Sequence, residues 1–97
     1  MPLFAMVGRD GPDGLERRPA VRPRHLEHLK ELDRDGKIFF AGPAFRDDGK
    51  TPQGSVVIFE ADDLESARAH CANDPYVLEG VFGEWDCSPV AQVFPEK

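Results

Sequence analysis

His25 is the side chain whose type and position best suit it for chemistry. In VRPRHLEHLKEL (21–32), Leu26, Leu29 and Leu32 recur at a helical interval and mark a face that we expect to be buried. His25 points in nearly the same direction as these leucines. A neutral imidazole at the mouth of a cleft, with a carboxylate orienting its other nitrogen, can serve as a general base and acid. The alternative is a core histidine bonded to a backbone carbonyl, which is the commoner use of a lone histidine on an apolar face.

Asp74 is the acidic residue in the most unusual position. In NDPY (73–76) it stands where a helix must end, directly before Pro75 and the aromatic Tyr76. An Asp before Pro is most often a turn residue that bonds its own backbone. The alternative is a carboxylate that shares a cavity with His25. Tyr76 could line the same cavity, although most aromatic residues of small domains belong to the core.

Arginines gather just before His25, at Arg17, Arg18, Arg22 and Arg24. A solvated basic edge is the usual meaning of such a run. A local arginine group beside a helix is also a suitable site for an anion such as a carboxylate or phenolate. The sequence leaves both interpretations open.

Four strands are predicted, in LFAMV (3–7), KIFFAGPAF (37–45), SVVIFEA (55–61) and VFGEWDCSPVAQVF (81–94). The second strand should break or bend near Gly42 and Pro43, and Pro89 should mark a bend or an edge position in the last strand. The segment RDGPDGLERRP (9–19) is rich in Gly and Pro and is predicted to be a loop.

Two helices are predicted between these strands. The first should begin at Pro23 and run to about Asp35, with Gly36 ending it. That start places His25 in the first turn, where the helix dipole favours the neutral ring. The second helix is LESARAHCAND (64–74), which Asp62 or Asp63 can cap. His28 and His70 are expected on exposed helix surfaces.

The resulting order, β-α-β-β-α-β, is typical of the ferredoxin-like α+β fold, an antiparallel sheet with both helices on one face. Helices on the same face can bring their ends to one cavity, which favours a contact between Asp74 and His25. We expect one domain over 1–97. The other face of the sheet carries apolar side chains, so in so small a domain we expect it to pack against a second copy in a homodimer.

Composition excludes several classes of function. The chain has 97 residues and a formal charge of −6. No basic run could neutralise phosphates, so a general nucleic-acid or anionic-membrane binder is not expected. No apolar run approaches the ~20 residues of a membrane helix, and the N-terminus does not resemble a signal peptide. Cys71 and Cys87 lack metal-ligand spacing and a neighbouring base, which favours two unreactive reduced thiols in a cytoplasmic protein. No cofactor fingerprint or metal motif occurs, so neither is expected.

The residues RRPAVRPRHLEHLKELDRDGKIFFAGP (17–43) and ADDLESARAHCANDPYVLEGVF (61–82) resemble the YciI-like (YCII-related) family. The resemblance covers essentially the whole chain, and its most specific parts are the RPRHL and AGP segments and the DPY that follows the second helix. It implies a subunit of the dimeric α/β barrel class that associates sheet to sheet. It also implies an active site built on a His–Asp pair, here His25 and Asp74.

The same resemblance places Arg22, Gly42 and Pro43 around the cleft, and we add Tyr76 as a substrate-binding candidate. A cofactor-free His–Asp pair can move a proton beside a carbonyl or phenol. With this chemistry the resemblance implies a lyase or isomerase type of enzyme for a small, anionic or cyclic oxygenated compound. The alternative is a non-catalytic small-ligand-binding or accessory module on the same dimeric scaffold, because such folds host unrelated functions. An oxygenase role ranks last.

Overall fold

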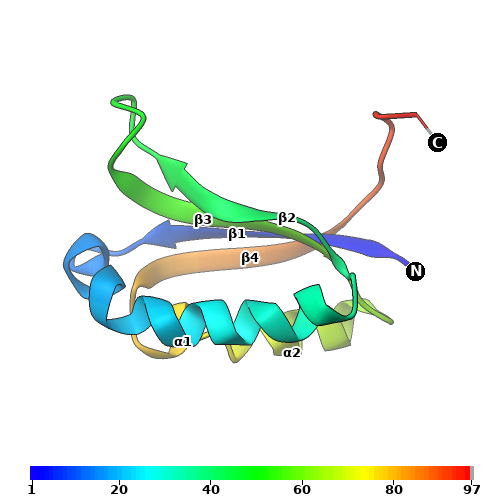
Figure 1. Ribbon diagram of the computed structural model, residues 1–97, viewed down its shortest axis with the longest axis horizontal. Coiled ribbons are helices and arrows are strands. Elements are labelled where there is room, and N and C mark those ends of the chain that lie inside the picture. Colours follow the sequence, from blue (N-terminus) through cyan, green and yellow to red (C-terminus); the bar gives the residue numbers. More distant parts are fainter. Residues whose placement is uncertain (97) are drawn as a thin grey trace.

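A computed structural model describes residues 1–96 and has the predicted order of elements, with one short helix added (Figure 1). The elements are β1 (Leu3–Asp10), α1 (Gly14–Arg34), β2 (Ile38–Phe45), β3 (Pro52–Glu60), α2 (Leu64–Ala72), α3 (Pro75–Leu78) and β4 (Phe82–Val90). The strands form one antiparallel sheet in the order β2-β3-β1-β4, and the helices cover one of its faces. The predicted ferredoxin-like α+β fold is confirmed. The predicted domain ends at Lys97, which lies outside the described residues.

Alternation along the strands gives the sheet a buried face for the helices. On β1, Phe4 and Met6 face the core, and on the neighbouring β3 the same is true of Val57 and Phe59. Because side chains of a strand point alternately to opposite faces, the intervening residues lie on the uncovered side. The helices complete the core with further buried residues, which include Val21, Ala67, Cys71 and Tyr76.

Helix α1 begins nine residues earlier than predicted, at Gly14, so the expected loop over 9–19 is wrong over most of its length. Pro19 and Pro23 lie inside the helix and on its exposed side. Each proline lacks the N–H that would bond the carbonyl group four residues earlier, so α1 loses one internal hydrogen bond at each of them. His25 consequently lies in the middle of α1, far from the helix N-terminus, so the predicted effect of the helix dipole on its ring is wrong. The predicted end is correct, because Gly36 adopts a left-handed φ of 68° just after the helix.

The buried face of α1 is formed by Gly14, Arg18, Val21 and His25, with the predicted leucines only partly buried beside it. The spacing of four, three and four residues is that of one helical face. A side chain at the first position would collide with the carbonyl oxygen of Val81, so only glycine allows α1 to pass this close to the chain. The helix thus presents a charged residue and an imidazole to the interior.

Helix α2 ends before the position that the sequence suggested. Asp63 caps its start by accepting a hydrogen bond of 2.7 Å from the backbone N–H of Ser66, as predicted. The helix stops at Ala72, and Asp74 then caps the short helix α3. His28 on α1 and His70 near the end of α2 are both half-buried, and the expectation that these two histidines lie on exposed helix surfaces is wrong.

The two edge strands accommodate the prolines. Strand β2 continues through Gly42 and Pro43 without a break, and its register shifts lie instead before Phe40 and after Ala44. An edge strand has one unpaired side, so a proline on that side removes no ladder hydrogen bond. Pro89 lies on the other edge strand, β4, which confirms the edge alternative for this residue.

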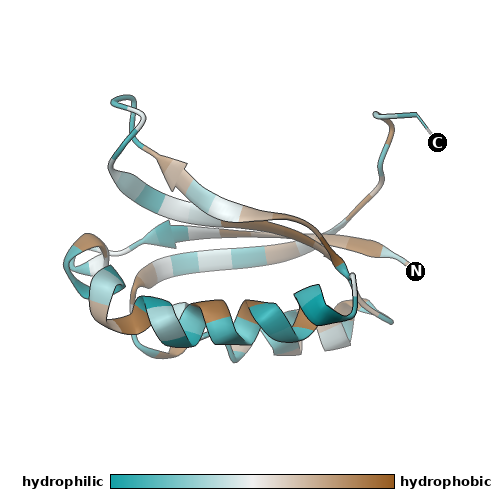
Figure 2. Cartoon of the chain, in the orientation of Figure 1, coloured by the Kyte–Doolittle hydropathy of each residue, from teal (hydrophilic) through white to brown (hydrophobic). Residues whose placement is uncertain are grey.

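Part of the uncovered face of the sheet is apolar. Leu3, Ala5, Ile58 and Val90 surround a hollow of about 330 Å³ there, together with residues 91–95 of the C-terminal segment. This segment leaves the sheet on the side away from the helices and carries hydrophobic residues (Figures 1 and 2). Among residues 1–96, no helix is long and apolar enough to cross a membrane.

Candidate active site

His25 and Asp74 are in direct contact, although 49 residues separate them in the chain. The Nδ1 atom of His25 lies 2.8 Å from Oδ1 and 2.9 Å from Oδ2 of Asp74. Both residues are buried, with 6% and 2% of their surfaces exposed. An ionised carboxylate can only accept hydrogen bonds, so Nδ1 carries the proton. In the neutral ring the lone pair is then on Nε2, the nitrogen on the other side from Asp74.

Asp74 performs both of the tasks that the sequence allowed. Its Oδ1 atom accepts a hydrogen bond of 2.8 Å from the backbone N–H of Tyr76, which is the turn role. The same carboxylate holds His25, which is the role in the pair. The cap fixes the carboxylate rigidly, because Pro75 and the first turn of α3 follow it at once.

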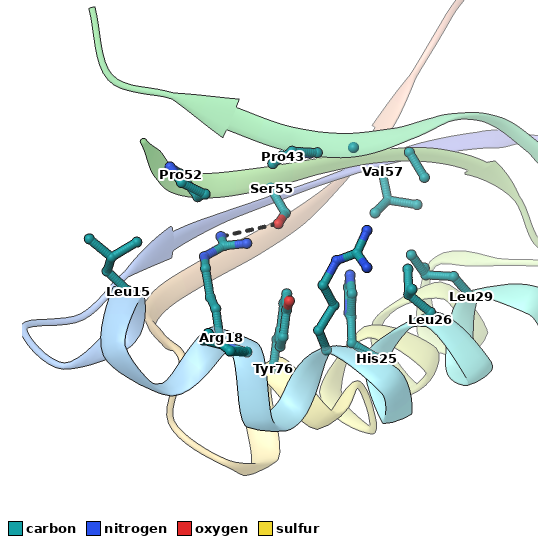
Figure 3. A pocket seen from close by; sticks show the side chains of 14 residues that line it. Leu15, Arg18, His25, Leu26, Leu29, Pro43, Pro52, Ser55, Val57 and Tyr76 are labelled. Atoms are coloured by element: carbon teal, nitrogen blue, oxygen red, sulfur yellow. Dashed lines mark hydrogen bonds between the residues drawn. The ribbon is translucent and has the colours of Figure 1, made fainter. Parts of the chain in front are cut away.

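Tyr76 stacks on the imidazole of His25, with ring centroids 3.8 Å apart and planes 7° from parallel. The guanidinium of Arg18 lies over the Tyr76 ring, 5.0 Å from its centroid. Burial raises the pKa of Tyr76 above its ordinary value, and the charges of Arg18 and Arg22 oppose that shift only in part. The phenol therefore remains a neutral hydrogen-bond donor, and its hydroxyl group points into the cavity (Figure 3).

Arg18 is buried, and its positive charge is compensated by Asp10. Its guanidinium donates to both carboxylate oxygens of Asp10, at 2.7 and 2.8 Å, and to the carbonyl oxygen of Gly54 at 2.8 Å. A longer contact of 3.4 Å reaches Oγ of Ser55. Burial by itself would lower the pKa of Arg18, but the hydrogen bonds and charge of Asp10 outweigh burial and raise it. Arg18 thus supports Tyr76 while bringing little net charge to the cavity.

The arginine group divides between the two predicted roles. Arg17 donates to the carbonyl oxygen of Glu79 at 3.2 Å, and Arg24 lies 3.6 Å from the carboxylate of the same residue, so both belong to an exposed edge. Arg22 lines the cavity and forms neither a hydrogen bond nor an ion pair with residues 1–96. It is the cation of this group that an anion in the cavity could use.

A cavity of about 500 Å³ opens between α1 and the strands β2 and β3 (Figure 3). Of the predicted site residues, Arg22, His25, Gly42, Pro43 and Tyr76 line it, and Asp74 lies behind His25. The remaining lining is mostly apolar and consists of Leu15, Pro19, Leu26, Leu29, Ala41, Pro52 and Val57, with Arg18 and Ser55. A flat, largely apolar molecule with few polar groups suits such a lining.

Sequence reasoning missed Leu15, Pro19 and Ser55 as lining residues and did not separate Arg18 from its neighbours. The first two were lost because their segment was interpreted as a loop. The spacing from Gly14 through Arg18 to His25 was a usable signal, since it extends the helical face of His25 toward the N-terminus. Nothing in the sequence distinguishes the buried Ser55 from other polar strand residues.

No metal centre can be assigned, since residues 1–96 contain no group of three or more His, Cys, Asp or Glu side chains arranged to hold an ion. Cys71 and Cys87 are both free and buried, and burial raises the pKa of each thiol. These cysteines lie in the core and do not line the cavity.

The fold and site define an α+β chain of the dimeric α/β barrel class with a buried His–Asp pair beside an apolar cavity. The family model of the YCII-related domain matches residues 2–90, and the chain belongs to this family. Protein YciI of Escherichia coli is 38% identical over 97 residues, covering 95% of this chain and 99% of that protein. An uncharacterised protein of Haemophilus influenzae is 35% identical over 94% of this chain and 98% of its own length.

Solved structures give the same classification. The 5-chloro-2-hydroxyhydroquinone dehydrochlorinase of Burkholderia phenoliruptrix AC1100, in complex with 2,5-dihydroxybenzoquinone, superposes with a TM-score of 0.80 at 28% identity. The match covers 93% of this chain and 94% of that one. An antibiotic biosynthesis monooxygenase superposes with a TM-score of 0.58 at 17% identity over 96% and 99% of the two chains, and this likeness shows the fold alone.

Proposed function

We propose that this protein is a cofactor-free enzyme of the lyase or isomerase type that uses His25 and Asp74 for proton transfer. The observation that carries the proposal is the hydrogen bond between Nδ1 of His25 and the buried carboxylate, which leaves Nε2 available to the cavity. Asp74 fixes the tautomer and stabilises the imidazolium that forms when His25 takes a proton.

The reaction begins when Nε2 of His25 removes a proton from a carbon or hydroxyl group of the substrate. The released electron pair forms a new C=C or C=O bond. In an elimination, a leaving group departs from the adjacent carbon with its own electron pair. In an isomerisation, the new double bond displaces the electron pair of a conjugated double bond onto a different carbon, the imidazolium returns the proton to that carbon, and no group is lost. Proton transfer of this kind contributes about 10²- to 10⁴-fold to a rate, so orientation in the cavity must supply the rest.

The substrate class follows from the lining of the cavity. Arg22 offers an uncompensated positive charge and Tyr76 offers a hydroxyl donor, while Gly42 and Pro43 belong to the opposite wall. A small, planar, cyclic compound with an anionic or phenolic oxygen satisfies all of these groups. The similarity to a dehydrochlorinase of a chlorinated hydroxyhydroquinone supports this class.

The test is turnover of a panel of small enolisable and phenolic acids by the wild type, His25→Ala, Asp74→Asn and Arg22→Gln. We expect the first two variants to lose turnover while they keep the far-UV circular dichroism of the wild type. Arg22→Gln should chiefly raise KM for anionic substrates. Arg24→Gln, an exposed neighbour on the same helix, is the matched control and should behave as the wild type.

The second candidate function is a non-catalytic ligand-binding or accessory module. It is favoured by the structural role of Asp74, since this residue both caps α3 and forms a hydrogen bond to His25 of α1. In that case some compounds of the panel bind without reacting. The wild type shows no turnover, and His25→Ala only lowers the stability of the fold. Binding by calorimetry with no product after long incubation would replace the first proposal by the second.

The homodimer is proposed on the uncovered face of the sheet. Val93 and Phe94 of the C-terminal segment are 70% and 75% exposed beside the apolar hollow there. A second copy would remove this apolar area from water. Light scattering on a size-exclusion column should give twice the mass of one chain, and Phe94→Asp should shift the protein toward the monomer.

We also propose a cytoplasmic location for this protein. Expression of the tagged chain followed by cell fractionation tests that assignment.

A further inference from the structure

A second contact joins α1 to the end of α2, one turn beyond His25. His28 lies three residues after His25 on α1, and its Nε2 atom is 2.8 Å from the carbonyl oxygen of His70. The rings of His28 and His70 are stacked, with centroids 4.0 Å apart. His70 lies four residues before Asp74. The two contacts therefore connect the same two stretches of chain, one helical turn apart on each of them.

The direction of the second hydrogen bond is fixed by its acceptor. A carbonyl oxygen only accepts, so Nε2 of His28 carries a proton and donates it. The same carbonyl also accepts from the backbone N–H of Asn73 at 3.3 Å, and the N–H of Asp74 donates to the carbonyl of Cys71 at 3.1 Å. His28 thus holds the last turn of α2, from which Asp74 follows directly.

We propose that His28 and His70 are positioning residues, which hold Asp74 in place for His25 and release it in acid. The proposal deepens the proposed function, because it concerns the geometry of the same His–Asp pair. Neither residue lines the cavity. Their effect on the site passes through the backbone that joins the end of α2 to Asp74.

The sensitivity to acid comes from the surroundings of His70. The Nε2 atom of His70 is buried and has no hydrogen-bond partner among residues 1–96, and its ring packs against Phe59 of β3, with centroids 5.7 Å apart. Burial and the charge of His28 lower the pKa of His70, while Asp74 and Glu31 oppose the shift. Protonation would place a positive charge against the stacked ring of His28 and leave a buried N–H group without an acceptor, which costs free energy.

The sign of the pH dependence follows from this lowered pKa. His70 binds a proton more readily when the contact is open than when it is closed. The closed contact is therefore favoured near neutral pH and above, and it weakens as the pH falls below about 6.5, the ordinary value for histidine.

The test uses the chain without any substrate, so its outcome is independent of turnover. Solvent exchange of the Nδ1 proton of His25 is measured by nitrogen-15 NMR in the wild type, His28→Phe, His28→Gln and Lys30→Ala. Phenylalanine keeps an aromatic ring but removes the donor, glutamine keeps a donor, and the exposed Lys30 is the control on the same helix. We expect exchange to be about fivefold faster in His28→Phe, as for one hydrogen bond, and close to the wild-type rate in the other two.

The pH dependence is tested with His70→Phe, which keeps the backbone carbonyl and an aromatic ring but cannot titrate. In the wild type, exchange of the His25 proton should accelerate as the pH falls below about 6.5, and in His70→Phe this step should disappear. The proposal is overturned if His28→Phe exchanges at the rate of Lys30→Ala, if His28→Gln is as fast as His28→Phe, or if the acid step persists in His70→Phe. None of these results would contradict the role of His25 as a base, which the turnover assay tests separately.

Discussion

Replacement of Asp74 by Asn separates the two tasks of this residue. The Asn side chain keeps an oxygen that can accept from the N–H of Tyr76, and Asn is as good a helix cap as Asp. Its amide group then faces Nδ1 of His25, where the carboxylate stood. Two N–H groups would oppose each other there, so we expect the imidazole to move its proton to Nε2 and to accept from the amide. Nε2 of His25 would then present an N–H group to the cavity, and His25 could no longer act as a base there.

The loss of stability can be estimated from the same contacts. A hydrogen bond to a charged group contributes about 1.5–3 kcal/mol, and the substitution exchanges one such bond for a neutral one. Since a neutral hydrogen bond contributes about 0.5–1.5 kcal/mol, we expect the free energy of unfolding to fall by about 1 kcal/mol, with no separate loss of the cap. For a domain of this size the melting temperature should fall by about 4–8 °C. Asp74→Ala removes the cap as well and should cost about 1 kcal/mol more.

Two measurements check this reasoning. Urea denaturation gives the free energy of unfolding of the wild type, Asp74→Asn and Asp74→Ala. Nitrogen-15 shifts of the imidazole in slightly alkaline solution report which nitrogen of His25 is protonated. If Nε2 of His25 remains the unprotonated nitrogen in Asp74→Asn, the carboxylate does not set the tautomer and the argument for a base facing the cavity fails.

Three further predictions concern residues around this pair. Arg18→Met should destabilise the fold by about 3–5 kcal/mol in urea denaturation, because it leaves a buried carboxylate unpaired. The exposed Arg24→Met should change stability little, and equal losses in both variants would contradict the assigned burial. Hydrogen bonds from the start of α2 lower the pKa of Asp63 in the folded chain. Its carboxylate therefore stabilises the fold at any pH above the unfolded-state pKa of about 3.9, and this stabilisation is lost as the pH falls through the lower folded-state pKa. Melting scans from about pH 5 to pH 2 should therefore show a larger loss for the wild type than for Asp63→Asn, and parallel curves would refute the assignment. Burial raises the pKa of Cys71 and Cys87, so both thiols should react with Ellman's reagent at least about tenfold more slowly in the folded chain than in urea, whereas a fast thiol in the native protein would show that the core is open there.

Local signals in the sequence determined most of the fold. The β-branched segment around Val57 could only be a central strand, and Gly36 and Asp63 mark helix ends by their backbone and side-chain chemistry. These features depend on neighbours within a few residues, so they can be recognised without the rest of the molecule. The motifs around His25 and Asp74 also sufficed to indicate the family.

The start of α1 was missed because two prolines lie inside this helix, which tolerates them where their side chains are exposed. Which side faces water depends on the sheet beneath the helix, and the composition of 9–19 by itself favours a loop. The dependence on the sheet also explains why the sequence did not distinguish Arg18 from Arg22. They lie on one helix, but Asp10 of β1 neutralises the first, and the second faces the cavity.

The sequence by itself determined which residues can exchange protons and which elements carry them. The order of elements and the family resemblance indicated the pair of His25 and Asp74, but only the tertiary structure decided how these two residues meet and which other residues meet beside them. His25 contacts Asp74 across 49 residues because both helices pack on one face of the sheet, and His28 contacts His70 for the same reason. Contacts between distant parts of a chain depend on the packing of whole elements, and no local pattern of residues records that packing.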